Sequence, residues 1–190
     1  MAKKESSLKN MIISLVVISF FASLALGGIY NITKEPIELA VKAKQENAIK
    51  EVLPAFDSLF SFKMMPDNGK DSIGINLAFK GDTLVGTAIG TYSNLGYNAT
   101  QIQLMIGFLP DASIQNISVI QQNETPGLGT KMKEPKFKDQ FNKKKPSEFK
   151  LKVKKDGGQV DAITAATISS RAFCDAVDRA YQIYQKKGEK

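Results

Sequence analysis

The feature that most constrains this chain is an uncharged apolar run near its beginning. Residues 11–30 read MIISLVVISFFASLALGGIY and contain no Asp, Glu, Lys or Arg. A run of this length rises about 30 Å as an α-helix, which matches the hydrocarbon thickness of a bilayer. We therefore expect residues 1–10 to form a cytoplasmic tail and residues 11–30 a transmembrane helix. Residues 31–190 should then form one extracytoplasmic domain.

The charges beside this run set its expected orientation. Lys3, Lys4 and Lys9 precede it, and only Glu5 offsets them. Because short lysine-rich segments stay cytoplasmic, the protein should cross the inner membrane once, with its main domain on the periplasmic or extracytoplasmic side. A cleaved signal peptide is the alternative, since residues 25–27 are Ala-Leu-Gly. The apolar core of such a peptide usually has about 7–15 residues, which favours a retained anchor.

Beyond the anchor, the pattern predicts an α+β fold with a mainly antiparallel sheet and flanking helices. A first helix should begin at residues 33–36 (TKEP), which supply a cap, an acid and an early proline, and should end near Pro54. A short helix is expected at residues 134–141, and a closing amphipathic helix from Ile168. The expected hairpins pair residues 73–79 with 83–91, 100–109 with 114–122, and 149–155 with 159–163.

Composition excludes several classes of chemistry. The chain has no histidine, which rules out Ser-His-Asp and Cys-His catalysis and removes the commonest metal ligand. Its lone cysteine, Cys174, cannot form an internal disulfide or a thiolate cage, and its apolar helical surroundings predict a small core residue. Neither a GxGxxG fingerprint nor a cysteine cluster is present, so NAD and iron–sulfur clusters should bind elsewhere.

Residues 131–155 form a lysine-rich region in a chain of net charge +7. This region holds eleven lysines against three acidic residues. It can be solvated surface, or it can dock on anionic lipid headgroups or on an acidic partner subunit. Nucleic acid is not an expected partner, because neither a recognition helix nor a cytoplasmic location is evident for this region.

A small-residue segment, residues 161–167 (DAITAAT), precedes the closing helix. The first backbone N–H groups of a helix lack internal partners and attract anions. A phosphate ester on Thr167 would lie against the N–H groups of residues 168–170, and the small Ala165 and Ala166 would allow close approach. On local physics alone, Thr167 can equally be an ordinary N-cap, worth about 1 kcal/mol over alanine.

A second segment, residues 124–130 (ETPGLGT), is rich in turn formers. Pro126 and Gly127 suit the centre of a type II turn, and Gly129 would let the backbone approach another surface. An ordinary tight turn is the alternative interpretation of this segment.

These two segments together carry a family resemblance. Residues 160–171 (VDAITAATISSR) and the ETPGLG loop resemble the FMN attachment region and a loop of the G subunit of the Rnf electron-transport complex. The C subunit of the sodium-pumping NADH:quinone oxidoreductase is similar. Residues 96–99 (GYNA) match a GYGG-like segment of those proteins more loosely. The resemblance extends over nearly the whole chain and implies FMN esterified through its phosphate to Thr167 by a flavin transferase.

The resemblance also implies the cofactor contacts, and it implies neither a catalytic residue nor a metal ligand. Leu128 would give the isoalloxazine ring an apolar face. One departure is Ala165, which stands where the family often has glycine; if that position needs a positive φ, alanine costs about 1 kcal/mol. The implied contacts are Thr164, Ala165, Ala166, Ile168 and Ser169 near the phosphate, and Thr125, Gly127, Leu128 and Gly129 near the ring.

The function implied by the resemblance is that of an electron carrier without a complete active site of its own. It would relay electrons between ferredoxin and NAD, coupled to ion movement, together with other membrane subunits in the lipid bilayer. Two alternatives remain: a non-redox, membrane-anchored assembly protein, and an independent FMN electron shuttle.

Overall fold

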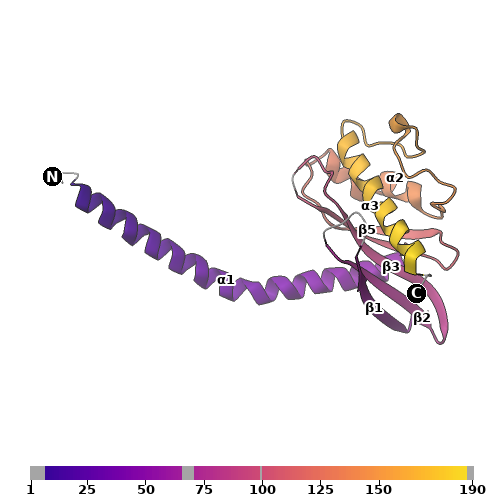
Figure 1. Ribbon diagram of the computed structural model, residues 1–190, viewed down its shortest axis with the longest axis horizontal. Helices are drawn as coiled ribbons and strands as arrows, with labels where there is room; N and C mark the ends of the chain where they lie inside the picture. The colour runs from indigo at the N-terminus through magenta and orange to yellow at the C-terminus, as the bar shows by residue number, and fades with distance from the viewer. Residues whose placement is uncertain (1–6, 66–70, 99, 188–190) are drawn as a thin grey trace. The chain divides into compact units, whose positions relative to one another are not determined.

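The chain divides into two compact units, Met1–Ala43 and Lys44–Lys190. The computed structural model describes residues 7–65, 71–98 and 100–187. Helix α1 (Leu8–Val52) begins in the first unit and ends in the second (Figure 1). Within the described ranges, α1 is the one helix that is long and apolar enough to cross a membrane. A signal sequence can be equally long and apolar, so the choice of a retained anchor over a cleaved signal peptide stays a prediction.

The expectation of a separate helix starting at residues 33–36 is wrong, because α1 continues through this segment. The hydroxyl of Thr33 donates to the carbonyl oxygen of Ile29 at 2.8 Å, one turn back, and caps no new helix. Pro36 lies inside α1. A proline removes one N–H bond without necessarily ending a helix that is continuous on both sides. The helix ends at Val52, close to the predicted end at Pro54.

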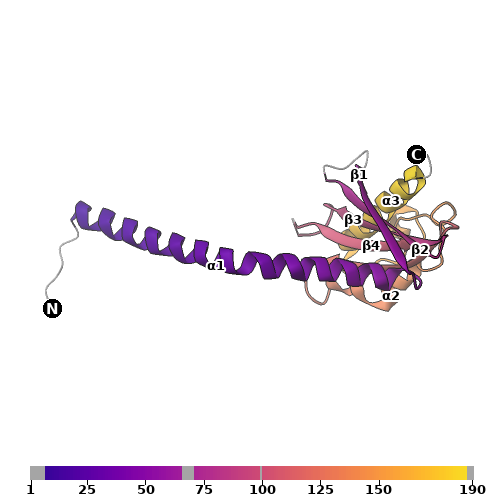
Figure 2. The same cartoon turned by 90° about the horizontal axis from the view of Figure 1, so that it is seen from below.

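A five-stranded antiparallel sheet in the order β1-β2-β3-β4-β5 forms the centre of the second unit (Figure 2). The first two predicted hairpins are confirmed, with Gly81 at positive φ between β2 and β3. Strand β1 was not predicted; it is an edge strand, largely exposed and paired only with β2, so it lacks a clear buried face. The strands are β1 (Ser58–Met64), β2 (Ile73–Lys80), β3 (Thr83–Ser93), β4 (Ile102–Phe108) and β5 (Ile114–Gln121).

Each face of the sheet is covered by a helix, which confirms the α+β fold class. Helix α3 (Thr167–Lys186) packs on β3 and β4 over the larger core, where Ile89, Ile106 and Phe173 are buried. The last turns of α1 cover the opposite face, where Val52 and neighbouring side chains form a second core cluster. The predicted helical stripe of α3 is therefore correct and supplies much of the interior.

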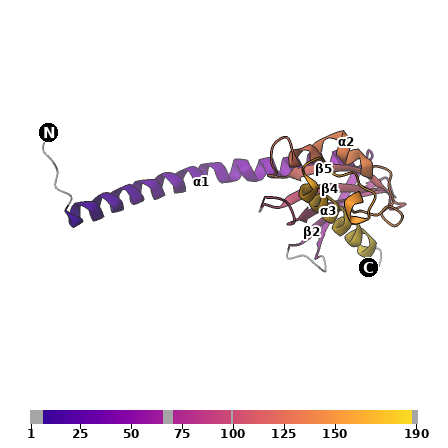
Figure 3. The same ribbon diagram turned by 90° about the horizontal axis from the view of Figure 1, so that it is seen from above.

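Loops and short helices connect β5 to α3 (Figure 3). These are the 3-10 helices η1 (Gly129–Lys133), η2 (Asp139–Phe141) and η3 (Lys154–Asp156) and the single turn α2 (Pro135–Lys138), of which α2 and η2 cover the predicted helix at 134–141. Phe137 and Phe141 pack edge-on and tilted against Phe173, with ring centroids 5.1 and 5.2 Å away. This aromatic contact ties the connection to α3.

The third predicted hairpin, residues 149–155 with 159–163, is wrong. Only an isolated bridge between Val153 and Val160 is present in the described part of this segment. The backbone is satisfied locally, because Lys154 N–H donates to Val160 O at 2.8 Å and Asp156 N–H to Val153 O at 2.8 Å. The apolar residues that suggested strands instead anchor a loop, with Val153 and Val160 buried in the core.

Candidate functional site

A tight turn sets the direction of the chain immediately before α3. The N–H of Ala166 donates to Ile163 O at 3.0 Å, and Ala165 between them has φ 60°. From the sequence, alanine is expected to be costly at residue 165 if that position needs a positive φ, and the structure shows that it does. Ala165 is the third residue of a type II turn, where glycine is favoured. Ser170 fastens the turn to the helix: its hydroxyl accepts from Ile163 N–H at 2.9 Å and donates to Ala166 O at 3.0 Å.

Thr167 is the first residue of α3, and Ala166 occupies the N-cap position without a side-chain capping bond. The alternative of Thr167 as an ordinary N-cap is therefore wrong. The first backbone bond of the helix runs from Ser170 N–H to Ala166 O at 3.0 Å. Within the described residues, the N–H groups of residues 167–169 consequently have no backbone partner, which is the usual basis of an anion site.

The loop of residues 124–130 forms the predicted type II turn. Leu128 N–H donates to Thr125 O at 3.1 Å, and Gly127 has φ 74°. Thr130 accepts from Gly127 N–H through its hydroxyl at 3.0 Å. The close approach predicted for Gly129 is also present, because a Cβ there would lie 2.6 Å from Ser169 Oγ. The loop and the first turn of α3 are therefore in direct contact.

A cavity of about 480 Å³ lies between this loop and the start of α3. Two predicted site residues do not line it: Gly127 shapes the turn, and Thr164 lies in a separate pocket with Asp161 and Gln140. The other predicted residues come together around one space, although the two segments are distant in the sequence. The lining residues are Tyr97, Thr125, Leu128, Gly129, Ala165, Ala166, Thr167, Ile168 and Ser169.

The chemistry of this cavity fits a flavin nucleotide. Free helix N–H groups at one wall suit a phosphate, while Leu128, Ile168 and the ring of Tyr97 offer apolar surface to a flat ring system. Leu128 is 38% exposed and Ile168 45%, so both side chains present apolar surface to an incoming ligand. Thr167, which is partly buried, lines the same cavity.

Comparison with known proteins agrees with this geometry. Residues 96–182 match the family model of the FMN-binding domain, a range that contains every residue lining the cavity. Over 90% of its length, the chain is 35% identical to the G subunit of the ion-translocating oxidoreductase complex of Methanosarcina acetivorans, 91% of which is covered. The chain belongs to this family of G subunits. The family membership expected from its two motifs is thereby confirmed.

Other G subunits align over similar lengths. The protein of Erwinia tasmaniensis is 33% identical, with 86% of this chain and 85% of the relative covered. The G subunit of the Na(+)-translocating ferredoxin:NAD(+) oxidoreductase complex of Acetobacterium woodii is 31% identical, with 90% and 88% covered. These alignments extend well beyond the matched domain, so the relationship does not rest on the FMN-binding domain alone.

Two residues at the site of this G subunit were not among the predicted contacts. Tyr97 lines the cavity, and its signal was the loosely matching segment 96–99, of which Ala99 lies outside the described residues. Glu124 is 3% exposed directly behind the cavity wall. The signal for Glu124 was its charge at the start of a loop of turn-forming residues. The sequence did not indicate which residues would form hydrogen bonds with it.

Asp161 holds the approach to the turn without entering the cavity. Its exposed carboxylate pairs with Lys154 at 2.7 Å. Its N–H donates to Gln140 Oε1 at 2.7 Å, and Gln140 Nε2 donates to its carbonyl oxygen at 3.1 Å. Gln140 therefore links residues 161–167 to η2. Asp161 fits the role of a residue that orients the turn before α3.

Arg171 and Cys174 lie further along α3 and do not line the candidate cavity. Arg171 grips Asp156 through Nε at 2.6 Å and Nη2 at 2.7 Å, and these hydrogen bonds, aided by the guanidinium charge, lower the pKa of Asp156. Burial raises the pKa of Cys174 to about 12, which keeps its thiol protonated and confirms it as a core residue.

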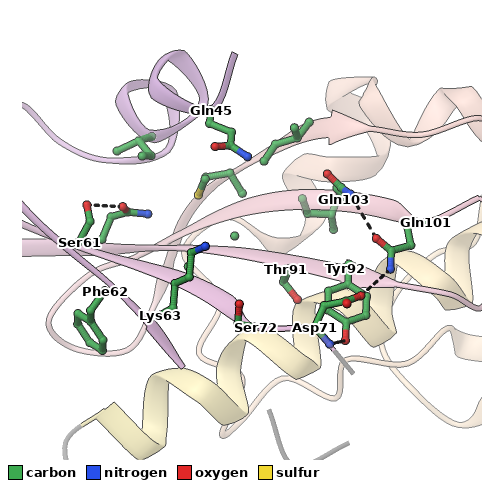
Figure 4. Close-up of a pocket in the computed structure, with 17 residues that line it drawn as sticks. Gln45, Ser61, Phe62, Lys63, Asp71, Ser72, Thr91, Tyr92, Gln101 and Gln103 are labelled. Atoms are coloured by element: carbon green, nitrogen blue, oxygen red, sulfur yellow. Dashed lines mark hydrogen bonds between the residues drawn. The ribbon is translucent and has the colours of Figure 1, made fainter. Parts of the chain in front are cut away.

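A roomier groove of about 720 Å³ lies on the sheet face near the end of α1 (Figure 4). Its polar groups largely bond one another: Gln103 donates to Gln101 at 3.3 Å, and Gln101 to Asp71 at 3.1 Å. None of the predicted site residues lines this groove. We assign the candidate site to the smaller cavity because helix N–H donors, apolar walls and Thr167 come together there.

Proposed function

We propose that this chain is the membrane-anchored flavoprotein subunit of an ion-translocating electron-transport complex and carries FMN as a phosphate ester on Thr167. The observation that carries the proposal is the cavity itself. It brings Thr167, the first turn of α3, whose leading N–H groups have no backbone partner within the described residues, and the turn at residues 124–130 to one space.

For the attachment, this chain would supply the hydroxyl of Thr167, and a flavin transferase would catalyse the transfer. The Thr167 oxygen bonds to phosphorus and loses its proton, while the bond to a leaving group breaks. Because the phosphate must be activated, we infer a flavin dinucleotide as donor, from which a nucleoside monophosphate leaves. The small Ala165 and Ala166 leave room for this approach, and the N–H groups of residues 167–169 hold the ester's negative charge.

The remaining residues position the ring system. Leu128 and Ile168 supply apolar contact, Tyr97 an aromatic face and Thr125 a hydroxyl at the cavity wall. When bound, FMN supplies reversible electron transfer, and the protein supplies position and electrostatics. Electron relay to partner subunits needs no substrate pocket beyond this cavity.

The same proposal includes topology and partners. Residues 1–10 would be cytoplasmic, 11–30 would span the inner membrane, and 31–190 would lie outside. The partners would be other membrane subunits, and the relay would connect ferredoxin and NAD, as the name of the Acetobacterium woodii relative states for that protein. The lysine-rich region, residues 131–155, is then available for headgroups or an acidic partner protein.

Coexpression with a flavin transferase tests the proposal. The intact protein should gain the mass of one FMN moiety and give a fluorescent band on a denaturing gel. Thr167→Ala should abolish the band, whereas Thr83→Ala, a control at an exposed strand start, should keep it. An unmodified mass would favour the alternative of a non-redox assembly protein. A fluorescent protein that purifies without partner subunits would favour the electron shuttle.

A further inference from the structure

We propose that Glu124 is the positioning residue of the flavin cavity and lowers the midpoint potential of the flavin held there; this inference rests on the proposed function. Glu124 is 3% exposed, and it is neither a predicted contact nor a lining residue. Its carboxylate nevertheless accepts hydrogen bonds from two other segments that form the cavity, residues 97–98 and the start of α3. A buried carboxylate with such contacts is costly unless its hydrogen bonds are made.

Three donors converge on this carboxylate. Tyr97 N–H donates to Oε2 at 3.2 Å, Asn98 N–H donates to Oε1 at 3.4 Å, and the hydroxyl of Ser169 donates to Oε2. Tyr97 and Ser169 both line the cavity, one from the segment after β3 and the other from α3. Glu124 therefore joins two walls directly and holds the third, its own loop, between them.

The backbone around Glu124 is packed too closely to rearrange freely. A Cβ added at Gly129 would lie 2.6 Å from Glu124 Cβ, and one added at Gly96 would lie 2.6 Å from Glu124 Oε1. Both glycines leave room for this one side chain. Loss of the carboxylate would leave the backbone N–H groups of Tyr97 and Asn98 without this acceptor, so both loops should open more often.

The charge of Glu124 gives it a second effect. The carboxylate lies immediately behind Gly129 and Ser169, which line the cavity, and no ion pair reaches it in the described part of the chain. Adding electrons near a fixed negative charge is disfavoured, and the burial of Glu124 weakens the solvent screening of its charge. The flavin should therefore be harder to reduce than it would be beside a neutral side chain.

The experiment compares Glu124→Ala, Glu124→Gln and Glu148→Gln in the full chain coexpressed with a flavin transferase. Glu148 is an exposed carboxylate outside the cavity and is the matched charge control. Amide hydrogen exchange is measured for residues 96–98 and 125–130, together with the flavinylated fraction by mass and the midpoint potential. The exchange measurement also works on protein without flavin.

We expect Glu124→Ala to exchange roughly tenfold to a hundredfold faster in both segments and to load less flavin. Glu124→Gln should load, because its amide oxygen can still accept from Tyr97 and Ser169, but its NH2 group would face the N–H of Asn98, so residue 98 should exchange faster. Its midpoint potential should move to a more positive value. Glu148→Gln should match the wild type in all three measurements.

Wild-type exchange in Glu124→Ala, or an unshifted potential in Glu124→Gln, would overturn the inference. If Glu124→Ala does not fold, exchange and potential in Glu124→Gln decide. If the wild-type protein takes up no FMN, the proposed function fails, and the exchange data alone decide whether Glu124 positions the loops.

Discussion

Gly129 faces Ser169 so closely that a methyl group on Gly129 would lie 2.6 Å from the Ser169 hydroxyl oxygen. The same methyl group would lie 2.6 Å from Glu124 Cβ. The absence of a side chain at one residue therefore allows the turn at 124–130 to rest on the first turn of α3. The cavity between them depends on this contact.

Gly129→Ala should consequently destabilise the domain and reduce flavin loading. Overpacking of this kind costs about 1–3 kcal/mol. The measurement is chemical denaturation followed by circular dichroism, with the flavinylated fraction read by mass. Gly74→Ala is the control, because nothing lies within 4 Å of a Cβ there. Equal behaviour of the two variants would contradict the packing argument.

Ala165→Gly should stabilise the protein, because Ala165 has φ 60°. An L-residue in this region costs about 1–2 kcal/mol, and the extra chain entropy of glycine offsets part of the gain. A net increase of up to about 1 kcal/mol in the free energy of unfolding is expected, together with faster flavinylation. Ala162→Gly, at an exposed position without positive φ, should give no gain.

Thr167→Ser should still accept FMN and should leave the midpoint potential close to the wild-type value. Attachment through the phosphate leaves the ring chemically unmodified, so loss of the threonine methyl group should not reach the redox centre. Redox titration of both proteins checks this. A large difference in potential would show that the tether does more than retain the cofactor.

The Arg171–Asp156 pair should make stability depend on acid pH. The Arg171 hydrogen bonds hold the pKa of Asp156 below its ordinary value, so the carboxylate stabilises the fold above that value. This contribution is lost as the pH falls through the lowered pKa. Denaturation midpoints of wild type and Asp156→Asn should differ at pH 7 and converge toward pH 2. A constant difference would exclude ionisation as the cause.

Cys174 should resist thiol reagents in the folded protein. It is 3% exposed, and burial raises its pKa to about 12, so little thiolate exists at pH 8. Labelling with a maleimide, followed by mass, should be slow in buffer and complete in denaturant. Rapid labelling of the native protein would show that α3 detaches easily from the sheet.

Predictions from the sequence were correct where local residue types alone determine the structure. The period of α3, the turn at Gly127 and the close approach at Gly129 could all be predicted from local residue types. The prediction of strands at residues 149–163 failed. Their apolar pattern looks strand-like, yet local turns satisfy the hydrogen bonds of their backbone. Tyr97 and Glu124 were missed because their importance comes from segments that meet only in the folded domain.

Helix α3 supplies both Thr167, the proposed attachment point, and a large part of the interior, including the fully buried Phe173, Ala176 and Ala180. Because the later turns of α3 complete the core, a chain released soon after residue 167 would hold Thr167 without the folded cavity around it. Under the proposed function, a bound flavin would therefore report that the whole of α3 has been synthesised and packed on the sheet.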